Sequence, residues 1–400
     1  MCVSTWPPQY ESFVVNQVKG LREAGQDIQI FARRRGTSDH LLPTGDRTLP
    51  DASVHFRPTI PSRKIPRLLK AAGFASLYGW RAPGLVRRSV SDGSQTWFEA
   101  IPFLTRRSFD IIHCQHGTIG LAMSRLIDEG FLNGRLVTAV RGSDLSSMAR
   151  LPESAETLFR KADRILPVSE SLRGQLERLG CPPEKLTLHR SGIDIATLQK
   201  HRCKKTRVHS ASCRVICVGR LVEKKGIDVL IDAVSRINQT VTVDVIGDGP
   251  LRGDLEAQAR RHRLDQHVTF SGWQPHDKVL ERVAQADILV SPSRTASDGT
   301  QEGVPNVLKE AMALGTPVIA TRHAGTPELI TDRVHGFLVP ENDCDALAMA
   351  LDEAIATPES LQELTDEAIH RVASQYDSRS LNESLIGLYH SLVTSRSQTT

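Results

Sequence analysis

Two glutamates frame a segment that could bind an anionic ligand rich in hydroxyl groups. Glu302 and Glu310 have seven residues between them, and the second lies in an apolar stretch that ends at Gly315. Pro305 fits the first turn of a helix, where its missing N–H costs no hydrogen bond. The unpaired N–H groups at such a helix start favour a phosphate or a polar sugar. The spacing therefore predicts one carboxylate at the mouth of a loop and another about two turns into a helix.

A second candidate segment is the loop GRLVEKKG, residues 219–226, which follows the apolar run 215–218. Arg220 offers a planar fork of donors, and Lys225 offers a mobile point charge. At the carboxyl end of a parallel strand, this pair matches the needs of a diphosphate. By itself the pattern also fits an ordinary charged surface loop.

Polar side chains also cluster at the end of a predicted strand, residues 110–114. His113, Gln115 and His116 lie there, and Asp144 follows a later strand. A strand-end histidine could donate a hydrogen bond to a sugar hydroxyl. A structural imidazole explains His113 equally well, and capping of the next segment explains Asp144 equally well.

Three further patterns carry less information. The run IGDGP, residues 246–250, lacks the third glycine of a dinucleotide fingerprint and also fits a tight turn. The triplet 343–345 reads Asp-Cys-Asp, but it stands where acids cap a helix. The 14 histidines show no ligand spacing typical of a metal site, so we expect no metal and no cofactor.

The segments that position these residues alternate between strand and helix, which predicts an α/β fold with parallel sheets that bind ligands at strand carboxyl ends. A chain of 400 residues suggests two domains. We place an N-terminal domain at 1–195, with strands at 28–32, 110–114, 136–140, 165–168 and 186–190. A second domain spans 196–377, with strands at 215–218, 241–246, 268–271, 287–291, 317–320 and 336–339. A final helix at 378–400 is expected to pack back towards the N-terminal domain.

The charge distribution bears on partners. The formal net charge of +4 is too small to indicate nucleic acid, and none is expected. However, ten lysines and arginines lie between Arg57 and Arg107, against only two acids. Apolar residues recur at helical spacing within the basic stretch 63–88, which could contact an anionic membrane surface. A solvated helix that covers the sheet is the alternative.

The remaining composition is that of an ordinary globular protein. The seven scattered cysteines form no CxxC pair and are expected to be reduced thiols of a cytosolic protein. No apolar run is long enough for a transmembrane helix, and no signal-peptide pattern opens the chain. We expect a cytoplasmic protein, with peripheral contact to the inner face of the plasma membrane as the finer hypothesis.

Nearly the whole chain resembles the retaining glycosyltransferases of family 4, which have the GT-B fold of two Rossmann-like doubly wound domains facing across a deep cleft. The most specific part is QEGVPNVLKEAMALGTPVIATRHAGTPELI, followed by HGFLVP. The segments GRLVEKKG, VIGDGP and LHRSGID match further family segments. The run WPPQYESFVVNQVKGLREAG resembles the opening helix of a subgroup that builds exopolysaccharide, including colanic-acid and amylovoran-type enzymes.

The resemblance implies a role for each matching residue. Glu302 would orient the donor sugar, Glu310 would hold the ribose, and Arg220 and Lys225 would stabilise the departing diphosphate. The resemblance makes 1–195 the acceptor-binding domain and 196–377 the nucleotide-sugar-binding domain. On the acceptor side it implies Ser12, His113 and Asp144. The catalytic set is Glu302, Arg220, Lys225, Gln115 and His116. The donor-binding set is Gly219, Arg220, Lys225, Gly247, Gly272, Trp273, Glu302, Gly303, Val304, Asn306 and Glu310, and Ser271 joins Gly272 and Trp273 beside the base.

Two departures from the family pattern concern the N-terminal domain. Gln115 stands where many members have the second histidine of His-x-His, and Arg141 stands where many have the histidine of His-Gly-x-Asp. The first strand is also shorter than usual, which suggests a truncated start.

We therefore expect transfer of a sugar from a nucleotide-diphosphate donor to a saccharide or lipid-linked saccharide acceptor, in cell-surface polysaccharide synthesis. A GT-B epimerase and an inactive nucleotide-sugar-binding protein are the alternatives. A phosphorylase and a nicotinamide enzyme fit less well, because the chain is short for the first and lacks GxGxxG for the second.

Overall fold

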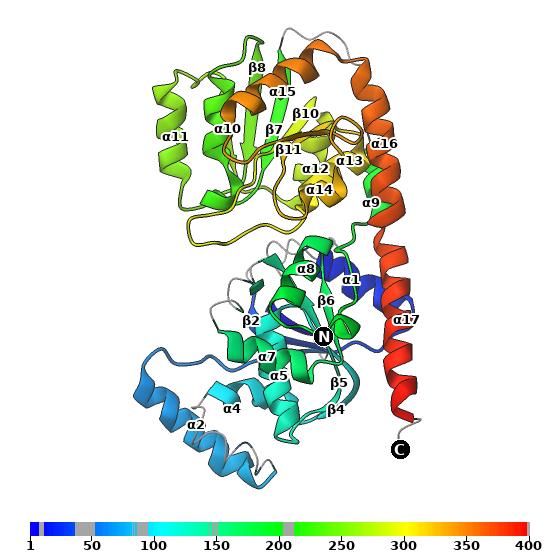
Figure 1. The fold of residues 1–400 in the computed structure, drawn as a ribbon. Coiled ribbons are helices and arrows are strands. Elements are labelled where there is room, and N and C mark those ends of the chain that lie inside the picture. Colours follow the sequence, from blue (N-terminus) through cyan, green and yellow to red (C-terminus); the bar gives the residue numbers. More distant parts are fainter. Residues whose placement is uncertain are drawn as a thin grey trace. The chain divides into compact units, whose positions relative to one another are not determined.

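The computed structural model describes residues 1–7, 12–36, 53–81, 83, 85, 95–142, 144–145, 148, 151–202 and 212–397. The chain forms two compact units, each built on a six-stranded sheet (Figure 1). The N-terminal unit comprises Met1–Val168, Arg173–His189 and Leu381–Thr400, and the C-terminal unit comprises Ser169–Leu172 and Arg190–Ser380.

The sheet of the N-terminal unit is parallel throughout, with the order β3-β2-β1-β4-β5-β6. The chain adds strands on one side of β1 and then returns to add strands on the other side, beginning with β4. Such a reversal of strand order creates a ligand-binding position at the carboxyl ends of the two central strands. The strands are β1 (Cys2–Trp6), β2 (Ile30–Arg35), β3 (Val54–Phe56), β4 (Ser108–Cys114), β5 (Asn133–Val140) and β6 (Arg164–Pro167).

Helices cover both faces of this sheet. Ile112, Leu136 and Ile165 of one face pack in a core with side chains of α4, α5 and α7. On the other face, Val137 shares a core with Tyr389 of α17. The helices are α1 (Ser12–Glu23), α2 (Lys64–Tyr78), α4 (Gln95–Ala100), α5 (Gly117–Asp128), α7 (Pro152–Lys161), α8 (Glu170–Arg178) and α17 (Ser378–Ser397).

The sheet of the C-terminal unit is also parallel, with the order β12-β11-β10-β7-β8-β9. Its strand order reverses between β7 and β10. The strands are β7 (Cys213–Val218), β8 (Val241–Ile246), β9 (Val268–Gly272), β10 (Ile288–Ser291), β11 (Val318–Thr321) and β12 (Phe337–Val339). The helices are α9 (Ile195–His201), α10 (Ile227–Val234), α11 (Arg252–Arg261), α12 (His276–Gln285), α13 (Asn306–Leu314), α14 (Thr326–Leu329), α15 (Cys344–Ala356) and α16 (Ser360–Gln375).

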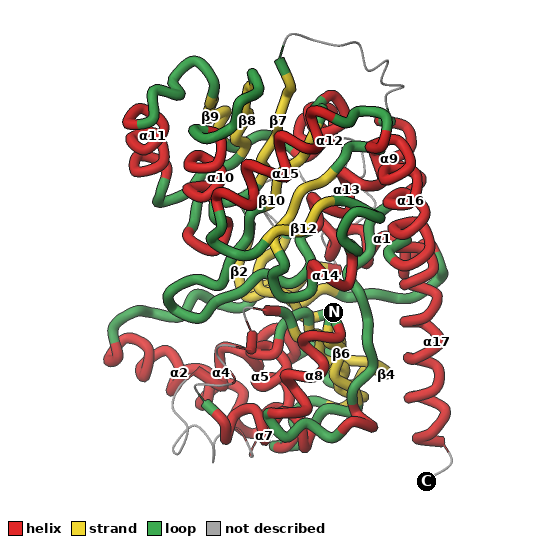
Figure 2. The backbone as a smooth tube through the Cα atoms, turned by 45° about the horizontal axis from the view of Figure 1, so that its top comes forward, coloured by secondary structure: helices red, strands yellow, loops and turns green. Residues whose placement is uncertain are grey.

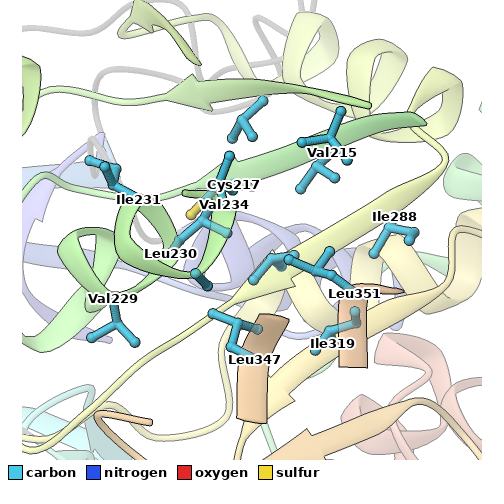
Figure 3. Close-up of a cluster of buried hydrophobic side chains, with 14 of the residues drawn as sticks. Val215, Cys217, Val229, Leu230, Ile231, Val234, Ile288, Ile319, Leu347 and Leu351 are labelled. Atoms are coloured by element: carbon cyan, nitrogen blue, oxygen red, sulfur yellow. The ribbon is translucent and has the colours of Figure 1, made fainter. Parts of the chain in front are cut away.

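Alternate residues of β7 enter opposite cores, as the pleat of a strand requires. Val215 and Cys217 pack with Leu347 and other side chains of α10 and α15, as Figure 3 shows. Ile216 instead joins a core with Leu308 and other side chains of α12 and α13. In Figure 2 the yellow strands of this unit therefore run between helices on both faces. Both faces of the sheet are buried, so only the strand ends remain for chemistry.

The expected α/β class is confirmed by the two parallel sheets. Two local predictions are wrong. Residues 186–190 form no strand, and only an isolated bridge joins Leu186 to Ile165. Residues 54–56 form β3, although the sequence around them has no clear period. Ser12 begins α1, and the six cysteines of the described segments are free thiols. Residues 203–211, which include Cys203, lie outside the described residues.

Candidate active site

The loops that follow β7, β8 and β10 come so close that side chains are excluded from part of the site. A Cβ atom on Gly226 would lie 2.0 Å from the Pro292 carbonyl oxygen. A Cβ on Gly247 would lie 1.9 Å from the carbonyl oxygen of Gly219. Gly226 has φ +61° and Gly247 has φ +140°, which L side chains rarely adopt. The backbone itself therefore lines the carboxyl end of β7.

Glu302 lies in the loop between β10 and α13 and contacts two lysines of the loop after β7. Lys224 Nζ is 2.8 Å from Glu302 Oε1, and Lys225 Nζ is 3.0 Å from Oε2. Burial by itself would raise the pKa of Glu302, but the charges of Lys225 and Lys224 outweigh it and lower the pKa to about 2. Glu302 is thus ionised, and the three side chains together carry one excess positive charge.

The backbone of Glu302 is held by a buried histidine. The Glu302 N–H donates to His323 Nε2 at 3.0 Å, and His323 lies directly beyond β11. Because Nε2 accepts, the ring proton is on Nδ1, which donates to Glu341 Oε1 at 2.7 Å. The other oxygen of Glu341 accepts the N–H of Thr295 at 2.8 Å. Hydrogen bonds to Thr295 and His323 lower the pKa of Glu341, although burial would raise it.

Glu310 is the fifth residue of α13, so it lies just over one turn from the helix start rather than two. Its Oε1 is 3.0 Å from Nε2 of His276, the first residue of α12. Burial by itself would lower the pKa of His276, but the hydrogen bond to Glu310 and its charge outweigh burial and raise it. Gly315 ends α13 in the left-handed region, with φ +76°, as the sequence predicts.

The other donor-side residues lie on the same strand ends. Arg220 is exposed directly after β7, and Trp273 is 36% exposed directly after β9. The carbonyl of Gly272 accepts the N–H of Gly247 at 2.9 Å, which ties the loops after β8 and β9 together. Ser271 donates to Asp244 at 2.5 Å. Gly303 and Val304 are half-buried ahead of α13, and Asn306 is its first residue.

In the N-terminal unit, a polar network lies at the carboxyl ends of β4 and β5. Gln115 is 1% exposed and donates to Gln17 Oε1 at 2.6 Å, while its own Oε1 accepts from Arg141 at 2.9 Å. Asp144 accepts the backbone N–H of Arg141 at 3.0 Å and lies 3.4 Å from His116 Nδ1. Gln115, His116 and Asp144 are thus brought together around Arg141.

His113 is placed apart from this network, beneath α17. It is 3% exposed, and its Nδ1 is 2.5 Å from the hydroxyl of Tyr389. Burial, together with nearby positive charge, lowers the pKa of His113 well below its usual value. This environment favours the structural imidazole, one of the two interpretations left open above, and its acceptor role stays a prediction.

The start of α15 and the arrangement of metal-ligating side chains complete the description of the site. Asp343 caps α15 by accepting the N–H of Ala346 at 2.8 Å, so capping explains this Asp-Cys-Asp triplet. Within the described segments, no group of three or more His, Cys, Asp or Glu side chains is arranged to hold a metal ion.

Comparisons with known proteins agree with this geometry. Residues 204–371 match the family described as glycosyl transferases group 1, and residues 10–197 match glycosyltransferase family 4. The protein named colanic acid biosynthesis glycosyltransferase WcaL of Salmonella typhimurium is 30% identical, over 97% of this chain and 98% of that protein. The chain belongs to the family 4 glycosyltransferases. The predicted family resemblance is thereby confirmed.

Other comparisons place this glycosyltransferase among proteins of similar fold. The amylovoran biosynthesis glycosyltransferase AmsK of Erwinia amylovora is 31% identical over 86% of this chain and 88% of its own. The structure of Anabaena HepE with UDP and glucose has a TM-score of 0.70 at 18% identity, covering 98% of both chains. Sucrose-phosphate synthase of Thermosynechococcus elongatus has a TM-score of 0.74 at 19% identity, covering 99% of this chain and 100% of its own. These likenesses confirm the GT-B fold.

Sequence reasoning missed four residues that the structure places at the candidate site. Lys224 stands directly before Lys225 in the run EKKG, so the doubled lysine could have predicted both contacts with a carboxylate. His276, His323 and Glu341 each follow a predicted strand, but nothing in their spacing shows which carboxylate or amide they face. The order of the strands decides those contacts.

Proposed function

We propose that this glycosyltransferase moves a sugar from a nucleotide-diphosphate donor with retention of configuration, to a saccharide or lipid-linked saccharide in exopolysaccharide synthesis. The observation that carries the proposal is the contact of Lys224 and Lys225 with Glu302 at the point where the strand order reverses. Two ammonium groups on one carboxylate leave positive charge for a diphosphate. The Anabaena relative holds UDP and glucose, and the bacterial relatives are named for exopolysaccharide synthesis, which supports this donor class and pathway.

In the proposed reaction, the C-terminal unit binds the donor and the N-terminal unit binds the acceptor. The acceptor hydroxyl bonds to the anomeric carbon on the face from which the diphosphate leaves, and a phosphate oxygen takes the hydroxyl proton. Arg220, Lys225 and the amides at the start of α13 stabilise the negative charge that grows on the diphosphate. Glu302 orients the sugar through its hydroxyl groups and forms no covalent bond to it. Glu310 holds the ribose.

The proposed charge stabilisation comes from side chains and amides, so we propose that transfer needs neither a metal nor another cofactor. Transfer that continues in EDTA would support this part of the proposal. Transfer that requires added Mg²⁺ would refute it.

A panel of UDP-, GDP- and ADP-sugars, each incubated with the protein, tests the activity itself. Release of nucleoside diphosphate with transfer or slow hydrolysis is the expected outcome. Inversion at C2 without an acceptor would indicate an epimerase, and binding without turnover would indicate an inactive binding protein. Thermal shift with UDP, GDP and ADP identifies the base, because a ligand that binds only the folded state raises its stability.

We also propose that α2 contacts an anionic membrane surface, which places the enzyme peripherally on the cytoplasmic face. Among the helices that the structure describes, none has the length and hydrophobicity that a membrane span requires. Large apolar side chains of α2 and the following turn are nevertheless strongly exposed: Ile65 by 72%, Leu69 by 69%, Leu77 by 65% and Trp80 by 75%.

Basic residues flank these apolar side chains. Arg63, Lys64 and Lys70 lie on α2 or next to its start, and Lys70 also lies 6.0 Å from the ring centre of Phe98. Exposed apolar groups beside cations are typical of a helix that lies in the membrane interface. In Figure 1, α2 extends along the edge of its unit beside α4.

Flotation with vesicles of phosphatidylglycerol and phosphatidylcholine at low salt tests the membrane proposal. The protein should float with these vesicles, and the double variant Ile65→Glu, Leu69→Glu should not. Met349→Glu is the matched control, because Met349 is 72% exposed on α15. Absence of wild-type binding, or equal binding by both variants, would remove the proposal.

A further inference from the structure

A buried histidine and a glutamate hold both ends of the loop that presents Glu302. Glu341 accepts the N–H of Thr295 at one end, and His323 accepts the N–H of Glu302 at the other. We propose that His323 and Glu341 are positioning residues for transfer: they fix the backbone from which the Glu302 carboxylate reaches the sugar. This inference rests on the proposed function and extends it to two residues that act through the backbone of the loop.

The direction of each hydrogen bond defines the pair chemically. Both bonds to the loop use backbone N–H donors, so the partner atoms must be acceptors. His323 can accept at Nε2 only while that nitrogen carries no proton, and Glu341 favours this tautomer by accepting from Nδ1 at 2.7 Å. His323 is 0% exposed, so water cannot replace the imidazole as the acceptor. The acceptor at Nε2 therefore depends on this pair.

Other contacts hold the middle of the loop but not its end. The backbone N–H and hydroxyl of Ser297 donate to Glu223, at 2.9 Å and 2.7 Å. The Ala296 N–H donates to the Thr300 carbonyl at 3.0 Å. These bonds shape the loop up to residue 300. Beyond it, the bond to His323 holds the backbone of Glu302, the residue whose carboxylate lies between the two lysines.

Changing the two lysines and changing the His323–Glu341 pair should have different effects on binding and turnover. Lys224 and Lys225 come from the loop after β7 and keep their charge when His323 is changed. Binding of a nucleoside diphosphate should therefore survive, while orientation of the sugar should suffer. A displacement of a catalytic group by about 1 Å can cost up to about 100-fold in rate. The expected signature is a lower kcat with an unchanged Kd for the nucleoside diphosphate.

Two isosteric variants separate the loop bond from the Glu341 bond. The amide oxygen of His323→Gln can reach the position of Nε2 and accept the Glu302 N–H. The shorter amide of His323→Asn reaches only the position of Nδ1 and can satisfy Glu341 alone. We expect kcat to fall by up to about 100-fold in H323N and by clearly less in H323Q, with the Kd for UDP, GDP or ADP within about twofold of wild type.

His335→Ala is the matched control, because alanine leaves no acceptor at this position. Nδ1 of His335 also accepts a backbone N–H, that of Thr331 at 3.1 Å, in the same unit but in a loop that holds none of the site residues. Its kcat should equal that of the wild type. Equal kcat values for H323N and H323Q, a wild-type kcat in H323N, or a loss of nucleotide affinity that parallels the loss of kcat would overturn the inference.

Residue-resolved amide hydrogen exchange provides a readout independent of turnover. In H323N the Glu302 amide should exchange faster, while the Thr295 amide keeps its protection through Glu341. Unchanged exchange at Glu302 would refute the inference even if transfer is slow. A wild type that turns over no nucleotide sugar would refute the proposed function instead, and exchange would still decide whether His323 holds Glu302.

Discussion

The strand ends of the two units differ in how their charged side chains are paired. At the end of β7, Lys224 and Lys225 meet one carboxylate, so positive charge exceeds negative charge. At the ends of β4 and β5, the guanidinium of Arg141 donates to the side-chain oxygen of Gln115, and Asp144 accepts the backbone N–H of Arg141. One unit thus places a carboxylate between two lysines, whereas the other places its cation against an uncharged amide.

Two buried histidines of the N-terminal unit differ from His276 of the C-terminal unit in the direction of their pKa shifts. Burial and the charge of Arg141 lower the pKa of His189 to about 4, and burial also lowers the pKa of His113. Both are neutral at physiological pH. His276 of the C-terminal unit instead has a raised pKa because it is paired with Glu310. We infer that the C-terminal unit meets the charge of the donor, whereas uncharged polar groups of the N-terminal unit meet the hydroxyl groups of the acceptor.

The largest effect should come from removing a cation of the C-terminal site. Lys225→Ala and Arg220→Ala should each lower the transfer rate by about 10²–10³, as for loss of one group that stabilises transition-state charge. Lys278→Ala is the control, because Lys278 is an exposed lysine of the same unit that pairs with Glu281. Steady-state kinetics measure the effect, and near-normal turnover of the Lys225 variant would remove its phosphate role.

The pH dependence of the free energy of unfolding should show the pairing of Glu302 with Lys224 and Lys225. The pKa of Glu302 falls from 4.5 to about 2 on folding, so its stabilising contribution is present above pH 4.5 and is lost as pH falls towards 2. The shift corresponds to about 3 kcal/mol. The free energy of unfolding should therefore fall more steeply below pH 4.5 in the wild type than in Glu302→Gln. Urea denaturation at several pH values measures both slopes, and parallel slopes would contradict the pairing.

A smaller effect is expected from the buried contact in the N-terminal unit. Tyr389→Phe removes the hydroxyl beside His113 Nδ1 and should lower the free energy of unfolding by about 1–3 kcal/mol, because a buried polar atom loses its partner. Thr394→Ala, on the exposed side of the same helix, should change it by less than about 0.5 kcal/mol. A stable Tyr389→Phe protein would show that the contact contributes little.

The smallest effect is expected from Gln115 of the N-terminal unit, and it should concern the acceptor and not the donor. Gln115→Ala removes the hydrogen bonds to Gln17 and to the guanidinium of Arg141, each worth about 1–2 kcal/mol, so the KM for the acceptor should rise by about tenfold. Binding of the nucleoside diphosphate should not change. Loss of nucleotide binding in this variant would contradict the assignment of the donor's charge to one unit and of the acceptor's hydroxyl groups to the other.

The sequence predicted what depends on local pattern and missed what depends on strand order. Gly315 was recognisable because it ends a helix in the left-handed region. Lys225 and Glu302 were recognisable because each stands in a loop whose sequence matches a family segment. The contact of His323 with Glu302 exists because β11 lies next to β10 in the sheet. A pattern along the chain shows that His323 follows a strand, but not which loop that strand end faces. Gln17 and Gln115 likewise meet across 98 residues of sequence.

The tryptophans give the protein its own optical reporters. Of the four tryptophans, Trp6 and Trp97 are 3% and 0% exposed, whereas Trp273 and Trp80 are 36% and 75% exposed. Trp273 stands beside the predicted base position, and Trp80 stands at the end of the apolar surface of α2. A nucleotide should therefore quench the emission of one, and a lipid surface should shift the emission of the other to shorter wavelength. Single substitutions of Trp273 and Trp80 by Phe would assign each signal without any added label.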